Sequence, residues 1–179
     1  MHALLSVSRA IDWLTDRFGT LAQWAVLLSC LISAGNALVR YLAGYTSNGL
    51  LEIQWYLFAA CVMLGAAQVL RVNEHVRVDL FYGRFSGKGQ ARIDLAGLLL
   101  FLLPVMVVMI WYAWPLFFSM WQSGERSNNA GGLVRWPAML MLPLGFALVL
   151  LQGVSEIIKR VAWLADRYEG EFHYERPLQ

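Results

Sequence analysis

Charged residues are scarce in this chain and are absent from its long apolar stretches. Only 15% of the 179 residues are charged and 59% are hydrophobic, whereas a soluble domain has about 25% charged and about 45–50% apolar residues. A soluble fold of this size has too little interior to bury so much apolar surface. The composition therefore excludes an ordinary soluble domain, and the net charge of +2 gives no reason to expect nucleic acid as a partner.

Cysteine and histidine are scarce where redox or haem chemistry would need them. The two cysteines, Cys30 and Cys61, lie inside apolar runs and form no CxxC pair, which excludes a disulfide oxidoreductase with exposed thiols. No histidine lies in such a run, which excludes a membrane cytochrome that holds haem between intramembrane histidines. Glu74, His75 and Asp79 have no second histidine nearby, which disfavours a metal site. We therefore expect no cofactor, no metal and no enzymatic activity.

Four uncharged apolar runs are long enough to cross a bilayer, for which a helix needs roughly 20 residues. They are Leu21–Val39, Ile53–Leu70, Leu95–Gly124 and Trp136–Ser155. The sequence therefore predicts an all-α integral membrane protein with four transmembrane helices in a single membrane domain. We expect an amphipathic helix at 1–18, transmembrane helices at 20–41, 50–71, 93–120 and 136–158, a cytoplasmic loop at 72–91, a periplasmic loop at 121–135 and a cytoplasmic tail at 159–179.

Basic residues fall mainly on one side of this arrangement. Eleven of the 14 lysines and arginines lie in the N-terminal segment, in residues 71–92 or in the tail, and only Arg40, Arg126 and Arg135 lie on the other side. Basic loops are retained in the cytoplasm. We therefore expect both termini to be cytoplasmic.

Two segments outside the predicted spans are expected to be interfacial helices. Residues 1–18 carry apolar side chains at spacings of three and four, which indicates one apolar stripe that can lie in the cytoplasmic membrane interface. The alternative is a cytosolic extension of the first span. A second interfacial helix is expected in the 72–91 loop, where apolar residues stand among charges. The stripe of the first helix consists of Leu4, Val7, Ile11, Leu14 and Phe18.

The third apolar run is longer than a bilayer requires. Its 30 residues would extend about 45 Å as a helix, whereas the hydrocarbon core is about 30 Å thick. The helix must therefore tilt, kink or continue outside the membrane, and Pro104 and Pro115 are the obvious kink sites.

No ionisable residue lies in the middle of a predicted span. A proton relay or an independent ion-coupled carrier would need such a residue, and no internal repeat supports an inverted-repeat transporter. Arg40 and Glu52 are predicted to form an ion pair across the short outer loop, with direct contact to substrate as the alternative. Asn36 and Gln68 are placed to form interhelical hydrogen bonds, and small residues in the first two spans favour close helix packing.

Specific motifs accompany this pattern. They are Asn36-Ala37-Leu38-Val39-Arg40-Tyr41, Leu51-Glu52-Ile53-Gln54-Trp55-Tyr56-Leu57-Phe58, Leu64-Gly65-Ala66-Ala67 and Asn73-Glu74-His75-Val76-Arg77-Val78-Asp79. Over roughly residues 20–160 the chain resembles the small membrane subunit, of DctQ type, of tripartite ATP-independent periplasmic (TRAP) transporters. Further motifs resemble the mannitol or chloroaromatic subgroup, namely Asn129-Ala130-Gly131-Gly132, Arg135-Trp136-Pro137 and Leu142-Pro143-Leu144-Gly145-Phe146. In one departure, Glu52 is followed by Ile53 and Gln54, whereas many members have two adjacent acidic residues here.

The resemblance implies a division of labour in the bacterial inner membrane. A large membrane subunit would carry the substrate and sodium in symport, and a periplasmic binding protein would deliver the substrate, typically an organic acid. The small multi-pass subunit would pack against the static scaffold of the large one, among membrane lipids. We also expect the loop at 122–135 to contact the binding protein.

The candidate partner-interface or structural residues come from these motifs and loops. A self-contained small channel or carrier formed by oligomerisation, and a membrane assembly factor, remain as alternatives. The candidates are Asn36, Arg40, Tyr41, Glu52, Gln54, Trp55, Gln68, Glu74, His75, Arg77, Asp79, Arg126, Asn129, Arg135 and Trp136.

Overall fold

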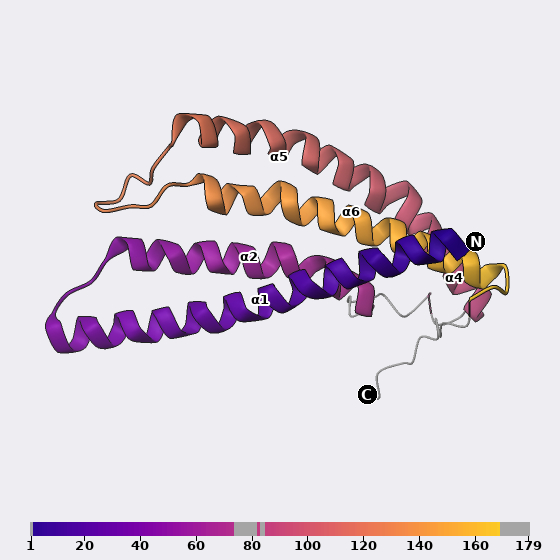
Figure 1. Ribbon diagram of the computed structural model, residues 1–179, viewed down its shortest axis with the longest axis horizontal. Coiled ribbons are helices and arrows are strands. Elements are labelled where there is room, and N and C mark those ends of the chain that lie inside the picture. The colour runs from indigo at the N-terminus through magenta and orange to yellow at the C-terminus, as the bar shows by residue number, and fades with distance from the viewer. Residues whose placement is uncertain (1, 74–81, 83–84, 169–179) are drawn as a thin grey trace.

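The computed structural model describes residues 2–73, 82 and 85–168, and most of these residues are helical (Figure 1). Four helices are long and apolar enough to cross a membrane, as the sequence predicted. The third of them, Gly87–Ser123, consists of three consecutive elements. In chain order the elements are α1 (His2–Ala43), α2 (Asn48–Val72), α4 (Gly87–Gly97), the π-helical turn η1 (Leu98–Leu102), α5 (Leu103–Ser123) and α6 (Trp136–Leu164).

The first helix, α1, is a single helix of 42 residues, or about 63 Å. The sequence placed a separate helix at 1–18 before a span at 20–41, but the structure joins the two, which corresponds to the alternative of an extended first span. The physical reason is that no proline or left-handed residue interrupts the segment. The first residue with positive φ is Gly44, at +63°, and α1 ends just before it.

The third long helix contains a widened turn next to Pro104. In η1 the Leu103 amide donates to the carbonyl of Leu98, five residues earlier. Pro104 has no amide hydrogen, and in a regular helix its ring would crowd the carbonyl four residues before it. The π-helical turn relieves this crowding, and the 37-residue helix curves visibly in Figure 1.

Helix α6 lies at the centre of the bundle and packs against α1, α2 and α5. The core between α1, α2 and α6 consists of Ala22, Leu64, Ala67 and Leu148. At Gly145, an added Cβ would lie 2.6 Å from the Cβ of Met63. The helices α2 and α6 therefore approach closely because this position has no side chain.

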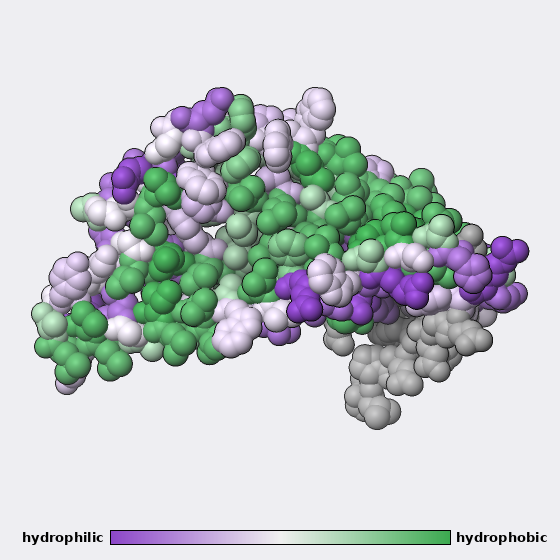
Figure 2. All heavy atoms as spheres, in the orientation of Figure 1, coloured by the Kyte–Doolittle hydropathy of each residue, from purple (hydrophilic) through white to green (hydrophobic). Residues whose placement is uncertain are grey.

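Polarity is distributed in the opposite way from a soluble protein. The largest fully buried side chains are those of Gln152, Thr15, Ser8 and Ser155, while many tryptophans and leucines are exposed. Figure 2 shows apolar residues over much of the visible surface, with hydrophilic residues near the left end and in a band that runs from the middle of the lower side to the right end. This distribution suits a protein whose surrounding solvent is lipid.

Candidate functional site

Polar interactions gather at two opposite ends of the bundle, and Figure 1 shows which helix ends lie there. We call the end with the α1–α2 connection and the α5–α6 loop the hairpin end. We call the opposite end, with the start of α1, α4 and the last turns of α6, the charged end. Each end brings together residues that are far apart in the sequence.

At the hairpin end, residues 124–135 form a tight turn that we call the α5–α6 hairpin. Arg126 and Val134 form an antiparallel bridge. The Ser127 amide donates to the carbonyl of Leu133 at 2.9 Å, and the Arg135 amide donates to the carbonyl of Glu125 at 2.9 Å. The backbone of the hairpin thus bonds largely to itself.

Glu52 of α2 holds this hairpin against the bundle. Its side chain is only 3% exposed. The Asn129 amide group donates to its Oε1 at 2.8 Å, and the backbone amide of Leu133 donates to its Oε2 at 2.7 Å. Tyr56, one turn further along α2, donates to the carbonyl of Val134 at 2.9 Å. The first turns of α2 therefore form a seat for the hairpin, with a buried carboxylate at its centre.

The predicted ion pair between Arg40 and Glu52 is wrong. Among the residues that the structure describes, no salt bridge joins these two side chains, and Arg40 is exposed at the end of α1. The physical reason is that both oxygens of Glu52 already accept hydrogen bonds from the hairpin. Arg135, another candidate, pairs with Glu125 at 2.6 Å within the hairpin.

Most of the remaining candidates at this end are exposed. Tyr41 is 87% exposed and Trp55 is 66% exposed, and Arg126 is also exposed, whereas Trp136 is half-buried at the start of α6. These exposed positions leave a surface of α1, α2 and the hairpin open to other molecules.

The interhelical hydrogen bond predicted for Gln68 stays a prediction, and the one predicted for Asn36 is not formed by its carbonyl oxygen in the described part of the chain. Gln68 of α2 lies against Gly19 of α1, at a position where a Cβ would collide with its amide. Asn36 is buried, but its Oδ1 has no hydrogen-bond partner within the described part of the chain, and the same holds for Nε2 of Gln54. Asn36 therefore forms no interhelical hydrogen bond through its carbonyl oxygen there.

At the charged end, one face of α6 carries a buried polar network. Asp12 of α1 accepts hydrogen bonds from Gln152 at 3.0 Å, Ser155 at 2.8 Å and Lys159 at 3.2 Å. Gln152 also accepts a hydrogen bond from Thr15 at 2.8 Å. These bonds fasten the first turns of α1 to the last turns of α6.

The network continues from α6 to α4 through charged side chains. Lys159 pairs with Glu156 at 2.5 Å, Glu156 pairs with Arg160, and Arg160 pairs with Asp94 at 3.2 Å. Glu156, Lys159 and Arg160 are all less than one-tenth exposed. Buried charges need partners of this kind, because an unpaired one would carry a large desolvation cost.

Sequence reasoning placed Asp94 and Glu156 only as separate groups near span ends and missed this network. A signal was available, because Gln152, Glu156, Lys159 and Arg160 recur at spacings that place them on one helical face. The α1 partners were not recognisable, because Asp12 was assigned to a separate interfacial helix. Four further candidates lie outside the described residues, namely Glu74, His75, Arg77 and Asp79. The second interfacial helix was expected in the 72–91 loop, of which residues 74–81, 83 and 84 also lie outside the described part.

The comparison with protein families gives one match. The family model described as "Tripartite ATP-independent periplasmic transporters, DctQ component" matches residues 29–162, which is more than half of the chain. The match includes α2, α5, the hairpin with its Glu52 seat, and most of α6. No curated protein and no solved structure matches the chain.

Proposed function

This chain belongs to the DctQ component family of tripartite ATP-independent periplasmic transporters, and we propose that it is the scaffold-type small subunit that supports a separate substrate-carrying subunit. It is a multi-pass membrane component of a transporter. The proposed role is to pack against the static part of the large membrane subunit in the bacterial inner membrane. The cargo would be an organic acid, moved in symport with sodium after delivery by a periplasmic binding protein.

The observation that carries this proposal is the placement of charge. The four apolar runs contain no aspartate, glutamate, lysine, arginine or histidine, and the buried charges Glu52, Glu156, Lys159 and Arg160 lie toward the helix ends. A carrier of an ionised substrate and a cation needs polar groups at mid-membrane depth. The substrate and ion sites are therefore assigned to the large subunit.

We assign the hairpin end to the periplasm and the charged end to the cytoplasm. Support comes from the basic residues, eleven of which lie in the segments at or beyond the charged end, since basic segments are retained in the cytoplasm. This orientation presents the α5–α6 hairpin to a periplasmic binding protein. The motifs around Asn129 and Arg135 support a place in the mannitol or chloroaromatic subgroup.

Reconstitution tests the division of labour. Vesicles that contain this chain, the large subunit and the binding protein are expected to accumulate the substrate when a sodium gradient is imposed, and omission of any one component should abolish uptake. The two membrane subunits should also copurify in equal amounts. Sodium-driven accumulation by vesicles that contain this chain alone would contradict the proposal and support a self-contained carrier.

The hairpin contact with the binding protein has a separate test. Among the three hairpin candidates, Asn129 and Arg135 have partners within the subunit, so Arg126 is the one to substitute. Arg126→Ala is expected to weaken binding-protein docking, measured as a raised half-saturating concentration of binding protein in vesicle uptake. Lys88→Ala, which removes an exposed cation at the opposite end, is the matched control. Equal uptake curves for both variants and the wild type would remove the docking role.

A further inference from the structure

The end of α1 reaches further from the charged end than the start of α6 does. In Figure 1 the α1–α2 connection lies beyond the first turn of α6. The Cβ of Ala22 lies 3.5 Å from the position that a Cβ would take on Gly65, which fixes the register of the antiparallel helices α1 and α2. In this register Glu52 is level with Gly35. The part of α1 after Gly35, which ends at Ala43, therefore extends past the level of Glu52.

Two levels of buried carboxylates indicate where the hydrocarbon of a bilayer lies. Helices α2 and α6 run parallel to each other, and Met63 faces Gly145. Glu52 is therefore level with the end of the α5–α6 hairpin, in agreement with its bond to the Leu133 amide. Glu156 lies about 22 residues further along the chain, which corresponds to about 33 Å of helix. Because the hydrocarbon core is about 30 Å thick, the levels of Glu52 and Glu156 match its two boundaries.

The end of α1 thus stands outside the lipid. It extends about 12 Å past the level of Glu52, whereas the headgroup layer adds only about 5–8 Å on each side of the hydrocarbon. We call residues Arg40–Tyr45 the α1 tip. Its large apolar and aromatic side chains are strongly exposed, at 87% for Tyr41, 78% for Leu42 and 63% for Tyr45. An exposed apolar cluster that lipid does not cover indicates a site of interaction with another protein.

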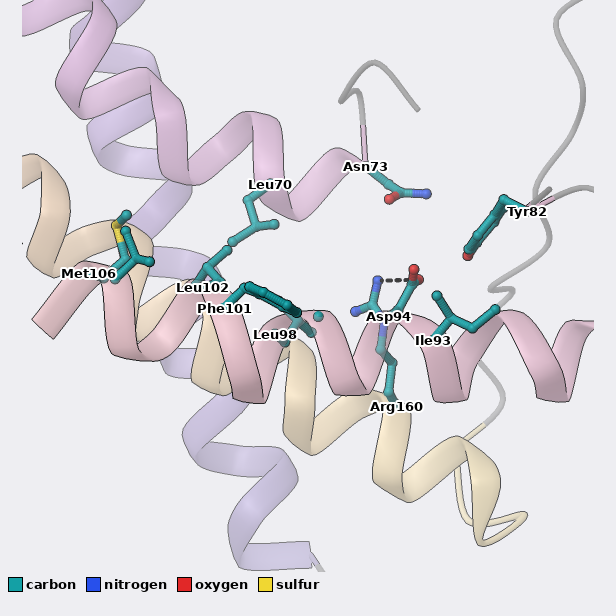
Figure 3. Close-up of a pocket in the computed structure, with 12 residues that line it drawn as sticks. Leu70, Asn73, Tyr82, Ile93, Asp94, Leu98, Phe101, Leu102, Met106 and Arg160 are labelled. Atoms are coloured by element: carbon teal, nitrogen blue, oxygen red, sulfur yellow. Dashed lines mark hydrogen bonds and ion pairs between the residues drawn. The ribbon is translucent and has the colours of Figure 1, made fainter. Parts of the chain in front are cut away.

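The α1 tip also carries a cation without a partner in the described part of the chain. The guanidinium of Arg40 is exposed, and no salt bridge between described residues includes it. The situation at the charged end is different, because Arg160 of α6 reaches Asp94 of α4 within the subunit (Figure 3). Arg40 is therefore available to a carboxylate on another molecule.

The character of the α1 tip favours a lasting partner over a transient one. Permanent interfaces are more hydrophobic than those that form and dissociate, and tyrosine and arginine are enriched among the residues that contribute most to binding. The α1 tip contains two tyrosines, one leucine and a single charge. The α5–α6 hairpin at the same end is more polar, which suits a partner that binds and leaves.

We propose that the α1 tip docks on the large membrane subunit, at an apolar surface that also presents a carboxylate to Arg40. This inference rests on the proposed function, since it requires that the chain has a large membrane subunit as its partner. It adds the contact surface and its chemistry. The contact would fix the outer end of α1, which extends past the rest of the bundle.

Cysteine protection tests whether the large subunit covers the α1 tip. Leu42→Cys is introduced after Cys30 and Cys61 are replaced by serine, and a membrane-impermeant maleimide is added to spheroplasts. The spheroplasts contain the chain alone, the chain with the large subunit, or the chain with the large subunit and the binding protein. Asn128→Cys is the matched control, because it is exposed at the same end but lies in the α5–α6 hairpin.

We expect both cysteines to react in the chain alone. The large subunit should slow the labelling of Leu42→Cys by about fivefold or more, because a covered thiol is less accessible, and should leave Asn128→Cys unchanged. Absence of labelling at Leu42→Cys in the chain alone would place the α1 tip in lipid and overturn the proposal. Equal labelling with and without the large subunit, or protection that appears only with the binding protein, would also overturn it.

Copurification tests the role of the cation. Arg40→Gln should reduce the amount of large subunit that copurifies with this chain by about fivefold, because the partner carboxylate loses its counter-ion. Arg126→Gln removes an exposed cation of the α5–α6 hairpin and should leave copurification at the wild-type level. Equal copurification by both variants would overturn the proposed contact and leave the proposed function intact. No copurification with the wild-type chain would overturn both.

Discussion

At the scale of single residues, the two most informative side chains are a carboxylate at one end and a guanidinium at the other. Glu52 accepts two hydrogen bonds from the hairpin, and Arg160 joins two carboxylates that come from different helices. Both side chains are buried, so each is bound to a fixed set of partners. Substitution of either one should therefore affect a defined part of the structure.

Glu52→Gln is expected to loosen the α5–α6 hairpin. The glutamine side chain keeps one acceptor oxygen, but its NH2 group would face the hydrogen-bond donor of either Asn129 or Leu133. One hydrogen bond is therefore lost, and the remaining one no longer has a charged acceptor. Amide hydrogen exchange of residues 126–134 should accelerate by roughly tenfold. Glu125→Gln, which alters only the exposed pair with Arg135, is the control and should change exchange little. Unchanged exchange in Glu52→Gln would show that the carboxylate does not hold the hairpin.

Arg160→Met is expected to destabilise the charged end strongly. The substitution leaves Asp94 and Glu156 short of a buried partner, and breaking a buried pair in this way typically costs about 3–5 kcal/mol. Thermal unfolding in detergent, followed by tryptophan fluorescence, measures the loss. Arg71→Met, which breaks the more exposed pair with Asp16, should cost about 1 kcal/mol or less. Similar unfolding temperatures for the two variants would argue against a network at Arg160.

At the scale of elements, close contact between α2 and α6 depends on the absence of a side chain at Gly145. Any Cβ there would meet Met63 at distances well below normal contact. The curvature of the third helix has a different local cause, since the π-helical turn η1 precedes Pro104. Each feature therefore has a single residue as its cause, Gly145 for the close contact and Pro104 for the curvature.

Gly145→Val is expected to push α2 and α6 apart. Overpacking of this kind costs about 1–3 kcal/mol, which thermal unfolding in detergent would detect as a lower midpoint. Gly35→Val is the matched control, because it adds the same atoms to a helix where the space is open. If both variants unfold at the wild-type midpoint, the close approach of α2 and α6 at Gly145 would be contradicted.

At the scale of the whole molecule, the arrangement is a bundle with polar contacts inside and apolar side chains outside. Its four long helices place the hairpin at one end and the buried charges at the other, with uncharged runs between them. A bundle of this kind is suited to hold a fixed position in the bilayer. It offers no charged path through its middle.

The proposed orientation of this body has a direct test. With Cys30 and Cys61 replaced by serine, a single cysteine is introduced at Asn128 in the hairpin or at Arg167 after α6, both exposed positions. A membrane-impermeant maleimide should label Asn128→Cys from the periplasmic side, and should label Arg167→Cys only after the membrane is permeabilised. The reverse pattern would invert the assigned topology.

Much of the architecture could be predicted from local patterns. Uncharged runs such as Leu95–Gly124 specify long helices because a helix satisfies its own backbone in lipid, and the motifs around Glu52 and His75 pointed to the family. The continuity of α1 was only the alternative prediction, because the apolar stripe of residues 1–18 was taken to mark a separate interfacial helix. In the structure Asp12 is instead half-buried against α6 and accepts hydrogen bonds from it.

The sequence alone therefore determined the number of spanning helices, their uncharged centres and the family, because these properties depend on neighbouring residues. Only the tertiary structure decided the partners of Glu52, Asp12 and Arg160. The bond from Asn129 to Glu52 joins residues 77 positions apart, and the bond from Lys159 to Asp12 spans 147 positions. Such pairings depend on how α6 rotates and packs against its neighbours, which no local periodicity encodes.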